Sequence, residues 1–292
     1  MFNSENVSLD NDTEIHFLQR VRHRRLVSFF GAGRCSDDGN IFIVLEFMEH
    51  GSLDTLLLED SEKVLSWGLR LRLLHDVALA MEHLHDKYDS IHRDLKSANV
   101  LLTQEKGSLR AKVADFGTSR FVSTNLSGAI ANDSKMEDKE SSLTEVLSPL
   151  SQGMSSIGSD TRVTMTSSEG TPTHMAPETW LALKKKDSIK LSKKIDVYAF
   201  SIIMWETLER KPVWADINFS YKIGNKVIDG ERPKFKKLKV GPDSPPYDYY
   251  TLMTRCWKGN PEDRPTFSTI SQIGSNWVEA FNVDDGEEEK VS

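Results

Sequence analysis

Cysteine is scarce in this chain, with only Cys35 and Cys256 among 292 residues. Two cysteines so far apart support neither a disulfide-rich fold nor a structural zinc site. The first residues lack a basic stretch followed by an apolar one, so no secretory signal is expected. The longest apolar run, 197–205, is about half of what a bilayer requires, and Asp196 and Glu206 flank it. These absences predict a cytoplasmic, intracellular protein without a membrane segment.

Positive charge is also in short supply, because 37 Lys and Arg stand against 44 Asp and Glu, a net charge of −7. Residues 279–292 hold six acids and one lysine, a local −5, which leaves only −2 for the rest. Nucleic-acid binding needs clustered Lys and Arg, so no nucleic-acid partner is expected. The acidic residues 279–292 are expected to form a disordered tail.

The first fifty residues combine a helical pattern with two strand patterns. The helical pattern begins near residue 14. Residues 26–30 then read as a strand closed by Gly31 and Gly33. Residues 41–45 are apolar throughout and mostly β-branched, which predicts a strand buried on both faces.

Helical periodicity dominates the later chain. Apolar residues recur every three or four positions from 73 to 84, and 196–208 is apolar nearly all round. The second pattern is typical of a buried central helix. A last helical region, 247–281, is broken at Pro261 and Pro265.

Residues 123–168 have a different composition, with 12 Ser and 5 Thr in 46 positions. Such a stretch buries too little apolar area to offset the entropy of ordering it. It is therefore expected to be a disordered insertion.

The strongest chemical signal is His92-Arg93-Asp94-Leu95-Lys96-Ser97-Ala98-Asn99, followed sixteen residues after Asn99 by Asp115-Phe116-Gly117. The Asp94 carboxylate can accept a hydroxyl proton, and the Lys96 ammonium can neutralise phosphate charge. The Asn99 amide oxygen and the Asp115 carboxylate can hold a hard cation. This order and spacing favour phosphoryl transfer.

These motifs, together with Met175-Ala176-Pro177-Glu178, 196–201 and 261–267, resemble those of the eukaryotic protein kinase family. The resemblance covers about residues 12–278, apart from the insertion. It implies an α+β, two-lobed fold with ATP, Mg²⁺ and a protein substrate. The small lobe would be partial, at 1–48, and the mainly helical lobe would occupy 49–278.

Two positions bear on the hydroxyl that would be phosphorylated. Lys96 stands where tyrosine kinases usually carry Ala or Arg, and Thr171 lies where the serine/threonine branch keeps a Thr that bonds to the catalytic Asp. The resemblance therefore implies a serine/threonine kinase, with motifs similar to those of the tyrosine-kinase-like group. Arg264 would pair with Glu178 beneath the substrate-binding segment.

The resemblance also implies a nucleotide site. Glu46 to Met48 would form the hinge that binds adenine, with Leu45 behind it as the gatekeeper. Ser52 would approach the ribose and Leu101 would pack under the ring. Core packing explains the apolar members equally well. Glu14 matches the helix Glu that normally pairs with a strand lysine.

One part of the family pattern is missing. The thirteen residues before Glu14 contain no lysine, and a glycine-rich loop with its strand lysine needs several times that length. Two readings remain open. The chain is a fragment or truncated gene model of an active kinase, which we favour because Asp94, Lys96, Asn99 and Asp115 are all kept. Otherwise it is a catalytically inactive, kinase-like binding or scaffold protein.

The Ser/Thr-rich insertion occupies the position of the family's activation loop. Arg93 is the residue that in the family meets a phosphate on that loop. We therefore expect phosphorylation of Thr166, Ser167 or Ser168 to order it. A tolerated linker without regulatory function is the alternative.

Overall fold

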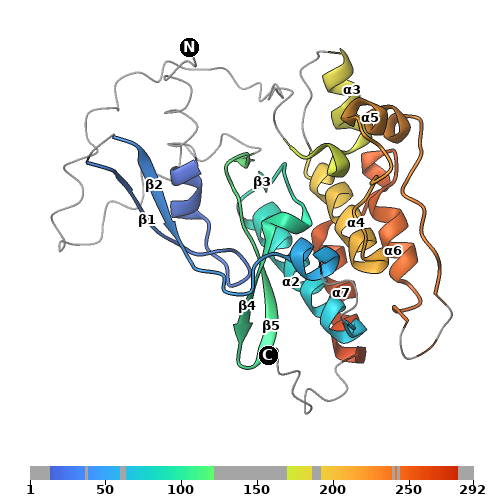
Figure 1. Ribbon diagram of the computed structural model, residues 1–292, viewed down its shortest axis with the longest axis horizontal. Helices are drawn as coiled ribbons and strands as arrows, with labels where there is room; N and C mark the ends of the chain where they lie inside the picture. The colour runs from blue at the N-terminus through green and yellow to red at the C-terminus, as the bar shows by residue number, and fades with distance from the viewer. Residues whose placement is uncertain are drawn as a thin grey trace.

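The computed structural model describes residues 14–36, 39–59, 64–121, 170–185, 192–238, 241 and 244–281. Figure 1 shows a small part with two strands and a short helix beside a larger, mainly helical part. The predicted α+β, two-lobed architecture is confirmed. The insertion expected at 123–168 and residues 282–292 of the expected tail lie outside the described residues, whereas residues 279–281, expected to be disordered, are the end of a helix, so the predicted boundary of the tail was wrong.

The small lobe contains β1 (Phe29–Arg34) and β2 (Ile41–Leu45), which pair antiparallel, and residues 14–20 are helical. The predicted strand at 41–45 is confirmed, but the one predicted at 26–30 is displaced. Residues 25–27 instead bond to the end of β5 (Ser108–Val113) in the large lobe, with Val27 N donating to Val113 O at 2.9 Å. Gly33 lies inside β1, where the Phe42 ring fills the space that a Cβ would need.

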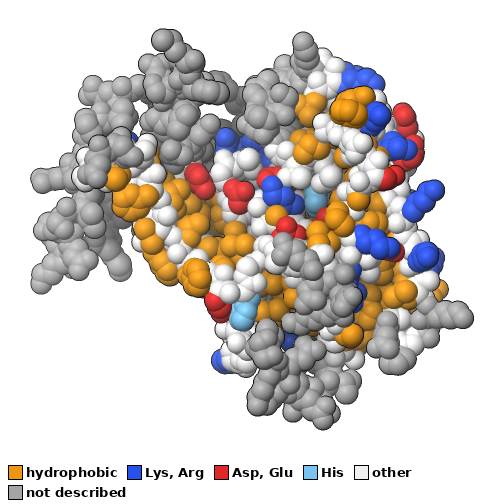
Figure 2. Space-filling model, viewed as in Figure 1, with side chains coloured by type: hydrophobic (Ala, Val, Ile, Leu, Met, Phe, Trp, Pro, Cys, Tyr) orange, Lys and Arg blue, Asp and Glu red, His pale blue; other side chains and the backbone are white. Residues whose placement is uncertain are grey.

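The expectation that 41–45 is buried on both faces was wrong. Phe42 is 51% exposed and Val44 is 45% exposed, whereas Ile41 and Ile43 are half-buried. Among the described residues the sheet of β1 and β2 has two strands, and only one of its faces packs on the core. Figure 2 shows hydrophobic side chains gathered on the surface of this part of the molecule. An apolar run therefore did not distinguish a strand covered on two faces from one covered on a single face.

The large lobe begins with short elements and a hairpin. A π-helical turn covers Thr55–Glu59, and β3 (Ser90–Ile91) pairs with β6 (Arg120–Phe121). The hairpin consists of β4 (Val100–Glu105) and β5 (Ser108–Val113). The longer helices are α2 (Trp67–Lys87), α3 (Pro177–Lys185), α4 (Lys194–Glu209), α5 (Ser220–Ile228), α6 (Tyr249–Cys256) and α7 (Phe267–Phe281).

One core holds the two lobes together. All residues of α4 from Ile195 to Leu208 are buried, which confirms the predicted central helix. Helix α2 packs against α7 and also against β5. Phe17 and Leu18 of helix 14–20 belong to the same cluster as these helices, so the core crosses from the small lobe into the large one. None of the described helices has the length and apolar character needed to cross a membrane.

Candidate active site

The loop that carries Asp94 is fixed by a buried carboxylate at the start of α4. Asp196 is 1% exposed and accepts the backbone N–H of His92 at 2.8 Å and of Arg93 at 2.9 Å. His85 of α2 approaches it at 2.8 Å through Nε2. Burial opposes ionisation of Asp196, but these contacts outweigh it and the pKa lies below its ordinary value. The loop bends there, since Arg93 has a φ of 75°.

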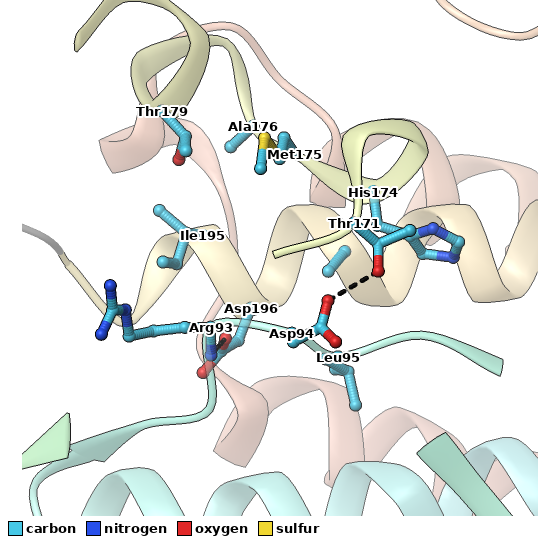
Figure 3. Close-up of a pocket in the computed structure, with 11 residues that line it drawn as sticks. Arg93, Asp94, Leu95, Thr171, His174, Met175, Ala176, Thr179, Ile195 and Asp196 are labelled. Carbon is cyan, nitrogen blue, oxygen red and sulfur yellow. Dashed lines mark hydrogen bonds between the residues drawn. The ribbon is translucent and has the colours of Figure 1, made fainter. Parts of the chain in front are cut away.

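Asp94, Lys96 and Thr171 form a closed triangle of hydrogen bonds. Thr171 Oγ1 donates to Asp94 Oδ1 at 2.7 Å, and Lys96 Nζ donates to Asp94 Oδ2 at 2.7 Å and to Thr171 Oγ1 at 2.9 Å. Figure 3 shows Thr171 and Asp94 facing each other across the pocket between the loop and the segment after Gly170. Burial raises the pKa of Asp94, but the two donors and the Lys96 charge lower it further, so the net shift is downward.

Asn99 joins this triangle to Asp115. Its Nδ2 donates to Asp94 O at 2.9 Å and to Asp115 Oδ2 at 3.2 Å. Asp115 lies two residues after the end of β5, has a φ of 63° and is exposed. Of the four polar residues predicted from sequence, Lys96 and Asn99 thus lie within hydrogen-bond distance of Asp94, and Asn99 links Asp115 to them.

The donor set at Asn99 and Asp115 fits Mg²⁺. The Asn99 Nδ2 lies 3.3 Å from Asp94 Oδ2 and 3.2 Å from Asp115 Oδ2, so one amide and two carboxylate groups, which carry the oxygen ligands that Mg²⁺ prefers, adjoin one another. Mg²⁺ takes one or two protein oxygens and completes its shell with water and phosphate, so it needs no larger cage. In the part of the chain that the structure describes, no three His, Cys, Asp or Glu side chains cluster as a metal cage.

Glu14 reaches the same place from the small lobe. Its carboxylate lies beside Asp115 and over Gly117, where a Cβ would approach Glu14 Oε2 to 3.6 Å. Burial, followed by the nearby Asp115 charge, raises the pKa of Glu14. No ion pair joins Glu14 to a cation among the described residues.

The residues predicted to hold the nucleotide divide into two groups. Met48 and Leu101 pack together with Val27 and Ala114, so they form one apolar surface beside Asp115. Leu45, by contrast, is 40% exposed. Ser52 lies next to the first group through its bridge to Leu101, and its hydroxyl bonds to Asp54 and Thr55.

The hinge residue Glu46 has its side chain engaged. Its carboxylate accepts Lys112 Nζ at 2.5 Å and Ser28 N at 3.1 Å, and its own N–H donates to Ser28 O at 2.8 Å. Burial raises the pKa of Glu46, but these donors outweigh it and bring the pKa below its ordinary value. The side chain therefore joins the segment predicted as the hinge to β5 through Lys112.

The expected pair beneath the substrate-binding segment is present. Arg264 is 2% exposed, and its Nη1 and Nη2 each donate to the Glu178 carboxylate at 2.7 Å. Arg264 also donates to the carbonyls of Lys194 and Lys258. This bidentate pair joins the start of α3 to the segment before α7.

Two carboxylates that sequence reasoning did not single out also support the site. Asp196 was noted only as the first residue of a helix pattern, yet it holds the Asp94 loop. Glu206, also on α4, accepts Ser97 Oγ at 2.7 Å and so anchors the other end of the loop. Acids inside an otherwise apolar helix pattern were the available signal.

Of the residues in the predicted phosphorylation switch, the structure describes only Arg93. Arg93 is buried, and its Nη1 donates to Thr118 O at 3.1 Å. Thr166, Ser167 and Ser168 lie outside the described residues.

Comparison with known proteins agrees with this geometry. The family model for the protein kinase domain matches residues 3–277. The chain belongs to the protein kinase family. This kinase domain is 34% identical over 269 residues to a Dictyostelium discoideum protein named as a LIM domain-containing serine/threonine-protein kinase, covering 92% of the chain and 32% of that relative. It is 29% identical over 257 residues to receptor-interacting serine/threonine-protein kinase 2 of Bos taurus, covering 87% of the chain and 40% of the relative.

The kinase domain thus corresponds to only part of its relatives. An RGS domain-containing serine/threonine-protein kinase of Dictyostelium discoideum is 30% identical over 257 residues, which are 88% of the chain and 18% of that relative. The chain spans two fifths or less of the length of these three proteins.

Proposed function

We propose that this kinase domain transfers the γ-phosphoryl group of ATP to a Ser or Thr hydroxyl of a protein substrate. The observation that carries the proposal is the triangle of Asp94, Lys96 and Thr171, joined through Asn99 to Asp115. Relatives named as serine/threonine kinases support the same choice of hydroxyl. The wording of the motifs favours the tyrosine-kinase-like group.

The chemistry assigns each side chain a task. The substrate Oγ attacks the γ-phosphorus, the bond to the bridging oxygen breaks, and ADP leaves. Asp94, whose lowered pKa keeps it ionised near neutral pH, orients the hydroxyl and accepts its proton. Lys96 lies 2.7 Å from Asp94 and offsets charge on the phosphoryl oxygens. Thr171 fixes the Asp94 carboxylate, so the proton acceptor is already oriented.

The cation would be held by Asn99 Oδ1 and the Asp115 carboxylate. When bound, Mg²⁺ would neutralise charge on the phosphates. The three carboxylates of Asp94, Asp115 and Glu14 lie close together, which favours a cation there.

The test is an Asp94→Asn substitution in the full chain. Loss of the proton acceptor is expected to lower kcat by about 10²–10⁴-fold while leaving nucleotide affinity largely unchanged. The measurement is transfer of labelled phosphate to a Ser/Thr peptide, with Asp86→Asn on the exposed face of α2 as the control. Unchanged turnover in the Asp94 variant would remove Asp94 as the base.

A second function, that of a binding module without catalysis, is favoured by one observation. Glu14 has no cationic partner among the described residues and lies beside Asp115 instead. On this reading the chain binds Mg·ATP weakly or not at all. A thermal-shift titration of the full chain with Mg·ATP separates the two, because a saturable increase in Tm supports the kinase proposal.

We also propose an intracellular site of action. Both cysteines are free, and Cys35 is exposed, which suits a reducing compartment.

A further inference from the structure

An open pocket lies on the large lobe at the tip of the β4–β5 hairpin. It has a volume of about 530 Å³ and is lined by Arg24, Glu105, Lys106, Ser108 and Arg110. None of these residues belongs to the Asp94 site. Three of the five carry positive charge, one carries negative charge and one offers a hydroxyl.

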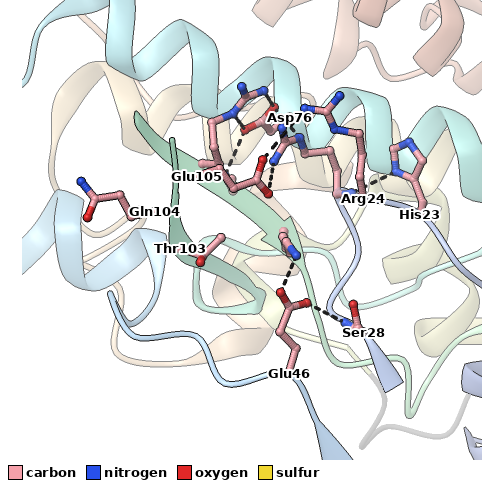
Figure 4. A network of polar contacts seen from close by, with 12 residues as sticks. His23, Arg24, Ser28, Glu46, Asp76, Thr103, Gln104 and Glu105 are labelled. Atoms are coloured by element: carbon pink, nitrogen blue, oxygen red, sulfur yellow. Dashed lines mark hydrogen bonds and ion pairs between the residues drawn. The ribbon is translucent and has the colours of Figure 1, made fainter. Parts of the chain in front are cut away.

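Beneath the pocket lies a buried network of charges, seen in Figure 4 where side chains from α2, β4 and the segment 23–25 converge. Arg25 and Asp76 have fully buried side chains and lie 3.0 Å apart. Arg110 Nε donates to Asp76 at 2.8 Å, and Arg25 Nη1 donates to Glu105 at 3.0 Å.

The network leaves an excess of positive charge. Four cations, Arg24, Arg25, Lys106 and Arg110, face two carboxylates, Asp76 and Glu105. Asp76 is shared by Arg25 and Arg110, and Glu105 is shared by Arg25 and, at 3.9 Å, Arg24, so the two carboxylates offset two of the four positive charges. Among the described residues, Lys106 has no ion-pair partner, and Arg24 has only Glu105 at 3.9 Å.

Two further observations agree with this excess. Arg25 Nη2 is buried and has no hydrogen-bond partner among the described residues. Burial, the stacked His83, and then Arg25 and Arg24 lower the pKa of the neighbouring His23 to about 4. His23 is therefore neutral near pH 7, and the excess comes from the arginines and Lys106.

We propose that this pocket is a binding site for a phosphate group. A dianion matches the net charge of the cluster. Its several oxygens can accept from Arg24, Lys106 and Arg110 together with the Ser108 hydroxyl, which one carboxylate cannot do. The bound group would join the segment 23–25 to the β4–β5 hairpin.

The test is an isothermal titration of the full chain with inorganic phosphate at constant ionic strength. Saturable binding is expected, and an Arg24→Ala/Lys106→Ala double variant should weaken it about fivefold or more, as expected for lost charge-assisted contacts. Both side chains are exposed, so the variant keeps the fold, which an unchanged Tm verifies. Lys184→Ala/Lys185→Ala on α3 removes the same charge at a distant exposed place and should leave affinity unchanged.

A second arm identifies the source of the phosphate. End-blocked peptides with a central phosphoserine, glutamate or serine are titrated in the same way. Tighter binding of the phosphoserine peptide than of inorganic phosphate supports a protein-borne phosphate, and weaker binding supports free phosphate. The proposal fails if phosphate does not saturate the chain, if the Arg24/Lys106 variant binds equally well, or if the glutamate peptide binds as tightly as inorganic phosphate does. No phosphoryl transfer is involved, so the proposed kinase activity is tested separately.

Discussion

The Glu14 carboxylate is partly buried beside a second carboxylate, that of Asp115, and both features disfavour its charged form. Burial and Asp115 raise its pKa above the ordinary 4.5, so the native protein holds this proton more tightly than the unfolded chain does. At pH 7 the charged form therefore costs stability. We expect Glu14→Gln to raise the free energy of unfolding by about 0.5 kcal/mol at pH 7, the size of a partly screened charge contact.

The pH dependence gives this prediction its sign. Below pH 4.5 the carboxyl is protonated in both states, so the advantage of Glu14→Gln should vanish there. Urea unfolding at pH 7 and pH 4 measures the difference. Glu279→Gln, on the exposed face of α7, should change neither value. A variant less stable than the parent at pH 7 would contradict the repulsion from Asp115.

Glu178, the partner of Arg264, is expected to behave in the opposite way to Glu14, because removing its carboxylate should lower the free energy of unfolding. The Arg264 side chain is fully buried and keeps both hydrogen bonds to Glu178 at 2.7 Å. Glu178→Ala leaves that guanidinium without its anion, and we expect a loss of about 3 kcal/mol in urea unfolding. Glu231→Ala, which breaks a 2.7 Å pair with Lys226 in which both side chains are exposed, should cost far less.

At the scale of elements, the catalytic loop depends on α4. Asp196→Asn replaces one carboxylate oxygen by an NH₂ group, which faces either the backbone N–H of His92 or that of Arg93. We expect a loss of about 2–4 kcal/mol in stability and a drop in kcat that exceeds any change in KM, because Asp94 shifts with its loop.

The dependence of the unfolding free energy on acid pH tests the same contact of Asp196 with the loop. The pKa of Asp196 is lowered in the folded protein, so its contribution is present above the unfolded value of 3.8 and is lost as the pH falls through the folded pKa. The stability difference between parent and Asp196→Asn should therefore begin to shrink as the pH falls below 3.8 and continue to shrink until the pH has passed the folded pKa. A difference that stays constant down to pH 2 would show that the carboxylate charge is not involved.

Hydrophobic periodicity predicted the helices whose sequence pattern is set by burial alone. Helix α4 was expected from a sequence apolar all round, and α7 from residues that follow Pro265, because burial alone sets both patterns. Strand β1 was displaced because residues 25–27 bond to β5, a partner more than eighty residues away. Local pattern cannot reveal such a partner.

At the scale of the whole molecule, some residues of the site could be predicted from sequence motifs and others could not. The spacing of Asp94, Lys96, Asn99 and Asp115 indicated their chemistry, because family motifs keep those residues close in sequence. The contacts that hold them could not be found in this way. Asp196 lies about a hundred residues from His92, and Asp76 is joined to Arg25 across two lobes. Each is a lone charge in sequence and gains its meaning only from packing.

The network around Asp76 leads to a prediction about the whole fold. Asp76 binds Arg25 of the small lobe, Arg110 of β5 and the backbone N–H of Ala111 at 3.0 Å. Asp76→Asn keeps the volume but removes the fully buried anion of Arg25, which then retains only the partly exposed Glu105 at 3.0 Å, and we expect this to cost about 3 kcal/mol. The loss should fall on the junction between the lobes, where Val27 N donates to Val113 O and Val113 N donates to Arg25 O.

Amide hydrogen exchange separates a local effect from a global one. In Asp76→Asn the amide protons of Val27 and Val113 should exchange through a local opening that requires less free energy than global unfolding. In Glu178→Ala, which loses similar stability far from the junction, the same two protons should still exchange at the global rate. Equal behaviour in the two variants would mean that Asp76 stabilises the fold as a whole and does not fasten one lobe to the other.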